Sequence, residues 1–194
     1  MKEEQHSDFH PEWCQELLED PSYTQSNALS RKPGESHGTR LSLMSRTLFT
    51  ENTIRAVRVL YKPLHRSMRE SRDALKDSSN DRLGGELLML ISLGDELGSH
   101  PGIVHGGMVM VLVDEVGGGI VSHELTHPDT IHSANFNINM RKSVRAPGIL
   151  LGRAWIERAP ERRKVWVKVR LEQDDGICAE GEVLYVRNKP RAKM

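Results

Sequence analysis

The sequence predicts an α+β domain in which a curved antiparallel sheet wraps around one central helix. Residues 107–123 indicate the helix, because they form the one strongly apolar stretch of helical length. Segments of strand-like composition precede and follow it, and glycine, proline and aspartate residues mark short turns between the later ones. A helix that is hydrophobic on most of its circumference is buried on most of it, and a sheet curled around it supplies that burial.

The residues before the helix divide into an extension and two strands. Residues 1–38 are polar, with one helical candidate at 11–19, and they predict an N-terminal extension that packs on the domain or is partly disordered. Residues 41–49 have no clear period and are compatible with a helix or irregular structure. The β-branched content of residues 53–62 predicts a strand, and residues 86–93 predict a second one.

The rest of the chain contains a charged stretch between the two strands, a glycine triplet in the helix and four later strands. The charged stretch 66–82 lacks an apolar stripe, which indicates a solvated loop or a short helix. Gly117-Gly118-Gly119 either allows another backbone to approach the central helix or ends it. Four strands follow, at residues 131–141, 149–157, 164–172 and 177–187. The domain is therefore expected to span residues 39–188, with a short tail at 189–194.

Composition restricts the class of protein. Among 194 residues, 27 Lys and Arg balance 27 Asp and Glu, so charge does not indicate a nucleic-acid partner. No apolar run approaches the roughly 20 residues that cross a bilayer, so no membrane span is expected. Cys14 and Cys178 lie far apart without metal-ligand spacing, which indicates a reducing compartment and no metal site.

The expected location is cytoplasmic or peroxisomal. The start of the chain is charged and is unlike a signal peptide. Ala192-Lys193-Met194 resembles the Ser-Lys-Leu peroxisomal signal, which a receptor reads at a free carboxyl terminus. The alternative is a plain basic tail.

Asp114 is the first candidate for chemistry, because it follows the apolar run 108–113 inside the predicted helix. An ionised carboxylate moved out of water costs several kcal/mol or changes its pKa, so it needs a partner or a function there. On a helical wheel it shares an apolar, glycine-rich face with Gly107, Met110 and Gly117. The functional interpretation is a base or nucleophile in a dry site. The structural alternative is a salt bridge across a dimer interface.

The residues in front of the helix supply the complementary chemistry. Gly106 and Gly107 follow His105 and let another group approach the helix start. Unpaired N–H groups collect there and favour negative charge, which suits an oxyanion. The structural alternative is a tight turn that needs glycine for its backbone conformation alone.

His105-Gly106-Gly107, Asp114 nine residues after the histidine, and the strand Ser133-Ala-Asn-Phe-Asn-Ile-Asn139 together resemble the hotdog-fold acyl-CoA thioesterases. The closest likeness is to the phenylacetyl-CoA thioesterase-like branch, and within it to the longer fungal and animal members with an N-terminal extension. The resemblance covers roughly residues 40–187. It implies a hotdog fold, which agrees with the sheet-around-helix architecture predicted from the residues.

The resemblance implies a role for each catalytic candidate. Asp114 would be the general base for water or the nucleophile on the thioester carbonyl, and the Gly107 N–H would donate to the oxyanion. His105 would hold the loop or touch the carbonyl oxygen. Ser133 would lie near the aspartate of the partner subunit and orient the attacking water; its structural alternative is a solvated strand serine.

The candidate substrate-binding residues surround these positions. Gly106 contributes backbone at the helix start, and Ser99 stands where many smaller family members have an asparagine. Strand alternation places Asn135 on a polar face with Ser133, while the apolar residues of that strand face the helix. The strand is followed by candidates for the phosphates of coenzyme A, for which a solvated turn is the alternative: Arg141, Lys142 and Arg145.

These expectations favour a thioesterase that hydrolyses an acyl-CoA to free acid and CoA without a cofactor. A homodimer or tetramer is expected, because the resemblance places Asp114 and Ser133 on different subunits. One alternative is hydrolysis of acyl groups on a carrier protein, since both thioesters present the same phosphopantetheine arm. Another is a non-catalytic acyl-CoA-binding module, against which the carboxylate of Asp114 argues.

Overall fold

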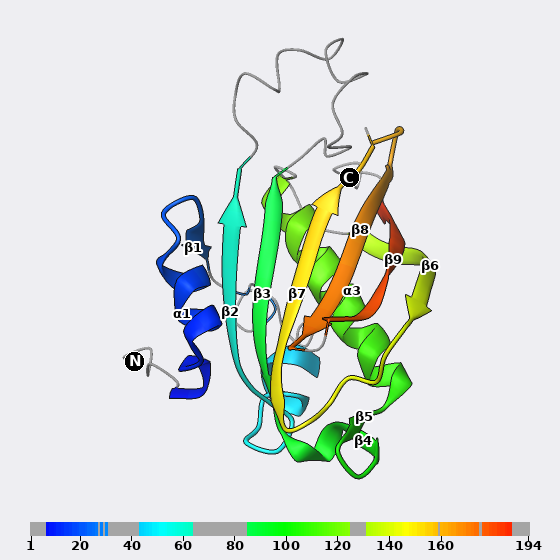
Figure 1. The fold of residues 1–194 in the computed structure, drawn as a ribbon. Coiled ribbons are helices and arrows are strands. Elements are labelled where there is room, and N and C mark those ends of the chain that lie inside the picture. Colours follow the sequence, from blue (N-terminus) through cyan, green and yellow to red (C-terminus); the bar gives the residue numbers. More distant parts are fainter. Residues whose placement is uncertain are drawn as a thin grey trace.

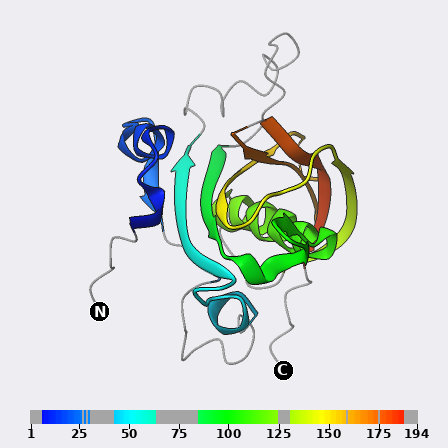
Figure 2. The ribbon, with the colours of Figure 1, turned by 60° about the horizontal axis from the view of Figure 1, so that its bottom comes forward.

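The computed structural model describes residues 7–26, 28, 30, 43–63, 85–124, 131–158, 160–174 and 176–187. Within them a long helix, α3 (Gly106–Glu124), lies in the hollow of a seven-stranded sheet. Figure 1 shows the strands passing in front of α3, and Figure 2 shows the sheet curving around it. This is the α+β arrangement predicted from the apolar stretch and its flanking strands.

The strand order in the sheet is β1–β2–β3–β7–β8–β9–β6, so β1 and β6 are its edges. All neighbouring strands pair antiparallel. The strands are β1 (Thr24–Ser26), β2 (Ile54–Lys62), β3 (Glu86–Leu93), β6 (Ile131–Met140), β7 (Gly148–Ile156), β8 (Lys164–Gln173) and β9 (Gly176–Arg187). Each of the strands predicted from the sequence is confirmed to within one residue at either end.

Short elements were not predicted. They are β1 and a second, two-stranded sheet formed by β4 (Gly98–His100) and β5 (Ile103–Val104), just before α3. Two or three residues are too few to display a strand's two-residue period. In the segment 41–49, which had no clear period, the structure has a single helical turn, η3 (Leu43–Thr47).

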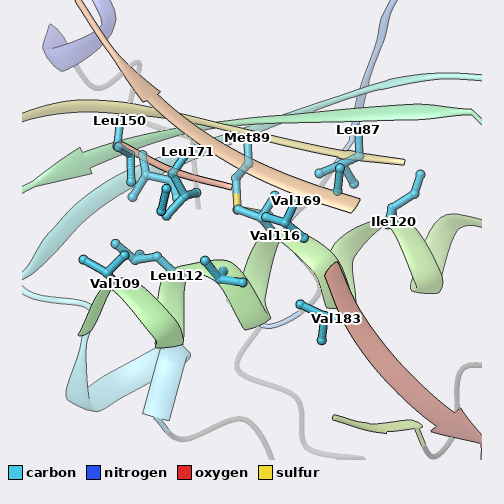
Figure 3. Close-up of a cluster of buried hydrophobic side chains, with 14 of the residues drawn as sticks. Leu87, Met89, Val109, Leu112, Val116, Ile120, Leu150, Val169, Leu171 and Val183 are labelled. Carbon is cyan, nitrogen blue, oxygen red and sulfur yellow. The ribbon is translucent and has the colours of Figure 1, made fainter. Parts of the chain in front are cut away.

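The main core lies between α3 and the concave face of the sheet. Val116 and Ile120 of α3 are fully buried there, and Gly152 of β7 leaves room for Val116 to approach the sheet. Figure 3 shows these helix residues packed against side chains from β3, β8 and β9. Burying a side chain of this size contributes about 1.5–3 kcal/mol, so the helix face and the strands stabilise one another.

The alternation predicted for β8 is confirmed. Its apolar residues are all at most 2% exposed: Val165, Val167, Val169 and Leu171. β3, in contrast, has an unbroken apolar run at 87–91, because this run is covered on both faces. Met89 packs in the core beside α3, whereas Leu88 and Leu90 belong to a second cluster on the outer face.

The N-terminal extension supplies the cover of that outer face. It contains the short turn η1 (Ser7–Phe9) and the helix α1 (Glu12–Glu19), which lies beside β1 and β2 in Figures 1 and 2. Phe9 and Cys14 are buried against the outer cluster. β1 then pairs with β2, so the extension continues the sheet. The helix expected at residues 11–19 is therefore present.

Several expectations concern residues outside the described part of the chain. The charged stretch 66–82, the tail 189–194 with Ala192-Lys193-Met194, and residues 31–42 are among them. No helix in the described ranges is long and apolar enough to span a bilayer.

Candidate active site

Asp114 lies on the wall of a pocket beside the C-terminal half of α3. The pocket has a volume of about 490 Å³, within the usual range for small-molecule sites. Its walls come from α3, from the beginning of β6, from β2, β3 and β9, and from the N-terminal extension. Its polar lining includes Asp114, Glu115, His123 and Ser133.

Two hydroxyl groups hold the half-buried carboxylate of Asp114. Tyr185 of β9 donates to Asp114 Oδ1 at 3.1 Å, and the same hydroxyl lies 2.9 Å from the backbone oxygen of Asp114. The hydroxyl of Ser133 in β6 also lies beside the carboxylate and lowers its pKa. Burial raises the pKa of Asp114 and outweighs the two hydroxyl groups, which lower it. The carboxylate therefore binds a proton more readily than a solvated one, which is the property of a general base.

Tyr185 reaches Asp114 because α3 has no side chain at position 117. A Cβ atom on Gly117 would lie 2.5 Å from the Tyr185 hydroxyl. Burial, followed by the charge of Asp114, raises the pKa of Tyr185 well above its ordinary value, so its hydroxyl keeps its proton. Gly117 of the glycine triplet thus leaves room for the Tyr185 side chain beside the helix. The interpretation that the triplet ends the helix is wrong, since α3 continues to Glu124.

A β-bulge in β6 brings Ser133 to this site. Ser133 pairs with Tyr185 of β9, but the next pair along β6 is Asn135 with Leu184, so Ala134 is an extra residue. Directly paired residues of an antiparallel ladder point to the same face, and the Tyr185 side chain points to the helix. Ser133 therefore faces the helix too.

The uniform alternation predicted for β6 is wrong at this bulge. Phe136 pairs with the buried Val183, so Ser133 and Phe136 share one face although they are three positions apart. Asn135, predicted to share a face with Ser133, lies on the opposite face and is not among the pocket-lining residues.

That Ser133 lies beside the aspartate of a partner subunit stays a prediction. Within one chain, Ser133 lies beside Asp114. The reason is the order of the sheet, in which β6 pairs with β9 and β9 packs on α3 within one chain.

A family model described as "Thioesterase superfamily" matches residues 101–180, which include the α3 start, Asp114, Ser133 and most of the later strands. Residues 101–180 match the thioesterase superfamily. None of the curated proteins compared with the chain matches it. The chain has the α+β hotdog fold, a curved antiparallel sheet around one central helix.

Several solved structures are similar to part of the chain. A phenylacetic acid degradation-related protein from Ralstonia eutropha JMP134 is 26% identical over 52% of this chain and 75% of its own, with a TM-score of 0.48. A thioesterase superfamily protein from Shewanella loihica PV-4 is 24% identical over 54% and 84%, with a TM-score of 0.45. A Bacillus halodurans protein solved with CoA is 21% identical over 51% and 65%, with a TM-score of 0.46. Similarities at this level assign no role to any residue of this chain.

At the start of the thioesterase-superfamily match, His105 and Gly107 contact each other. The Gly107 N–H donates to His105 Nδ1 at 3.0 Å, and both residues are exposed. Gly107 and Asp114 are seven positions apart, which corresponds to about 10 Å along a helix axis. One chain therefore brings Ser133 to Asp114 but leaves the helix-start N–H groups outside the pocket.

The candidate cations also lie at the α3 start. Val104, which leads into α3, donates its N–H to the backbone oxygen of Val144 at 2.9 Å, beside Arg145. Arg141 forms an exposed ion pair with Glu180 at 2.7 Å. Arg145 and Lys142 are exposed as well. None of these cations lines the pocket.

Ser99 does not join the other candidates. It lies in β4, is exposed, and its hydroxyl pairs with the Nδ1 atom of the neighbouring His100 at 3.1 Å. Gly106 lies near Met140, whose side chain would be 3.9 Å from a Cβ atom at position 106. The helix start is thus open to approach, as expected from its glycines.

Sequence reasoning missed several residues of the pocket. Tyr185 stands at an apolar position of the β9 alternation, where a tyrosine looks like any core residue. The one hint of its role was Gly117, because a glycine in a helix leaves room for a side chain from another strand. Glu115 accepts a hydrogen bond from Ser30 of the extension. His123 was missed because a lone histidine carries no spacing signal.

Proposed function

We propose that this protein is a thioesterase that hydrolyses an acyl-CoA to a free acid and CoA, with Asp114 as the residue that acts on water or on the carbonyl. The observation that carries the proposal is the Asp114 carboxylate, which is half-buried in a pocket and held by Tyr185 and Ser133. This carboxylate lies within the segment that matches the thioesterase superfamily.

As a general base, Asp114 takes a proton from a water molecule while the water oxygen attacks the thioester carbonyl. Ser133, next to the carboxylate, orients that water. The tetrahedral intermediate collapses by breaking the C–S bond, and the CoA thiolate accepts a proton. As a nucleophile, Asp114 would instead form an anhydride that water hydrolyses in a second step. Both routes need the ionised carboxylate.

The oxyanion of either route needs a hydrogen-bond donor. We propose the N–H of Gly107, at the positive end of the α3 dipole. Because this group is about 10 Å along the helix from Asp114 of the same chain, the donor would come from a second copy. His105 Nδ1, which accepts from this N–H here, would hold the loop until a substrate oxygen replaces it.

The edge strand β6 supports a homodimer. Among the described residues no strand pairs with its outer edge, and two of its large apolar residues are exposed, Phe136 by 36% and Met140 by 53%. Exposed apolar edge strands pair with other chains unless they are covered. A second copy along β6 would cover them and bring a helix start toward Asp114. Tetramers built from such dimers are compatible with the same contact.

The cations at the α3 start would contact the CoA phosphates. Arg141, Lys142 and Arg145 are exposed there and outside the pocket. Carrier-protein thioesters share the phosphopantetheine arm but lack the nucleotide phosphates, so the two substrate classes are separable by experiment.

The test is release of free thiol from acyl-CoAs of varied length, with acyl-carrier protein as a parallel substrate. Asp114→Asn is expected to lower kcat by about 10²- to 10⁴-fold, the usual contribution of a general base. Asp95→Asn, an exposed carboxylate outside the pocket, is the matched control and is expected to keep wild-type rates. Equal rates for Asp114→Asn and the wild type would refute the proposal.

A further inference from the structure

We propose that the pocket beside the C-terminal half of α3 holds the acyl group of the thioester, and that Ala28 and Ser30 of the N-terminal extension form its selectivity wall, which Ser26 helps to attach to the helix. This inference rests on the thioesterase function proposed above. It assigns a function to a segment that lies outside the matched residues 101–180.

The charges of the pocket separate the acyl half of the substrate from the CoA half. Asp114 and Glu115 line it, and none of the described lining residues is a lysine or arginine. A nucleotide with its phosphates would be repelled there. The acyl group carries no such charge, so with the thioester carbonyl at Asp114 it is the part of the substrate that enters the pocket.

The extension is attached to α3 on both sides of Ala28. Ser26 Oγ lies 2.8 Å from His123 Nε2, and the other ring nitrogen of His123 lies 2.9 Å from the backbone oxygen of Gly119. Ser30 donates to Glu115, which precedes His123 by about two turns of α3. The wall is thus held along the helix by side-chain hydrogen bonds at each end.

Ala28 is the part of the wall that an acyl group would meet. It packs against the main core cluster and also lines the pocket. Across from the extension, Gly118 of the helix lines the pocket without a side chain, and an added Cβ atom there would contact nothing within 4 Å. A small residue on the wall and a glycine on the helix therefore create the space.

The volume indicates the size of the group. At about 490 Å³ the pocket is roughly three times as large as an engineered cavity of about 150 Å³ that binds benzene. A medium-sized acyl group fits this space. Larger side chains on either wall would shorten the acyl group that fits.

The experiment compares Ala28→Leu and Gly118→Ala with the wild type, using kcat/KM for straight-chain acyl-CoAs from acetyl to palmitoyl. In both variants the medium-chain substrates are expected to lose about tenfold or more relative to acetyl-CoA. Gly118→Ala is the second variant because alanine favours the helix, so a changed profile there cannot come from unfolding.

Thr24→Leu is the matched control, since Thr24 is exposed on β1 and is not in the pocket. Its chain-length profile is expected to equal that of the wild type. If the chain-length profile is unchanged in both Ala28→Leu and Gly118→Ala, or if the rates fall equally for all substrates, the extension does not select the acyl group. That result would not count against the proposed thioesterase activity.

Absence of turnover by the wild type would instead count against the proposed function. The wall would then be tested by calorimetry with the same acyl-CoAs and the same variants. A chain-length dependence of Kd that differs between wild type and both variants supports the wall, and an identical dependence overturns it.

Discussion

The two ends of helix α3 have opposite environments. At its start, His105, Gly106 and Gly107 are exposed, and the Gly107 N–H is occupied by the histidine next to it. Further along, Asp114 is half-buried and contacts Tyr185 of a different strand. The backbone donors are thus at the open end. The carboxylate lies in the middle of α3, where the pocket-lined part of the helix begins, and we call that part the enclosed end.

This contrast shows how far one chain completes the site. The enclosed end has its carboxylate, its positioning hydroxyl groups and a pocket of about 490 Å³. The open end has donors and cations, but these lie about two helical turns from the carboxylate. The difference favours a site shared between two copies, in which the open end of one chain meets the enclosed end of the other.

Apart from the loss of the Asp114 carboxylate itself, the largest effect is expected from a change at the open end. Gly107→Pro removes the N–H but keeps the helix, because the first helical turn tolerates proline. Loss of one oxyanion donor lowers kcat by about 10²- to 10³-fold. The measurement is steady-state hydrolysis of the best acyl-CoA, with circular dichroism to confirm that the helix is retained.

Mixing this variant with Asp114→Asn sharpens the comparison. If each site takes Asp114 from one chain and Gly107 from the other, a mixed dimer contains one intact site. Random reassociation would then restore about a quarter of the wild-type activity. If both residues act within one chain, every site in the mixture stays defective and no activity returns.

A smaller effect is expected at the enclosed end from Tyr185→Phe. The variant loses the hydrogen bond to Asp114 Oδ1, and kcat is expected to fall by about tenfold. That hydrogen bond lowers the pKa of Asp114, so its loss raises the pKa further. Activity needs the ionised carboxylate and is lost as pH falls through this pKa, so the acid limb of the pH–rate profile moves to higher pH.

Tyr23→Phe is the control for this shift. It also removes a tyrosine–carboxylate hydrogen bond, 2.7 Å from Tyr23 to Glu86, but away from the pocket. Its acid limb is expected to match the wild type. The other titratable groups on the pocket wall are Glu115, His123 and His132, which both variants leave in place. An unshifted profile in Tyr185→Phe would mean that the tyrosine is structural only.

The smallest effect is expected from the cations at the open end. Lys142→Ala and Arg145→Ala should each raise KM for acyl-CoA about two- to fivefold, the scale of an exposed ion pair. KM for acyl-pantetheine, which has no nucleotide phosphates, should not change. Lys164→Ala, an exposed cation on another strand, is the control. Equal effects on both substrates would exclude phosphate binding.

The predictability of the fold differs between strands. β8 is flanked by β7 and β9, so its side chains alternate regularly between core and solvent, and its pattern alone was sufficient. β6 is an edge strand with a bulge, and the same reasoning assigned Ser133 and Asn135 to the wrong relative faces. The two-residue alternation of a strand sequence does not reveal an inserted residue, because the register is set by pairing with the neighbouring strand.

The catalytic candidate itself was visible in the sequence, whereas its partners were not. A carboxylate in an apolar helix stands out because its burial is costly. Tyr185 and Ser133 contact it from positions 71 and 19 residues away, and neither has a local pattern that distinguishes it from a core tyrosine or a surface serine. Only the packing of β6 and β9 around α3 brings them together.

The sequence by itself determined the apolar helix, the longer strands and the buried carboxylate, because hydrophobic periodicity and the cost of burying charge act over a few neighbouring residues. The tertiary structure decided three further features. They are the bulge that turns Ser133 inward, the glycine space that admits Tyr185, and the extension that closes the pocket at Ala28. Each depends on contacts between segments far apart in the chain, whose geometry no local pattern contains.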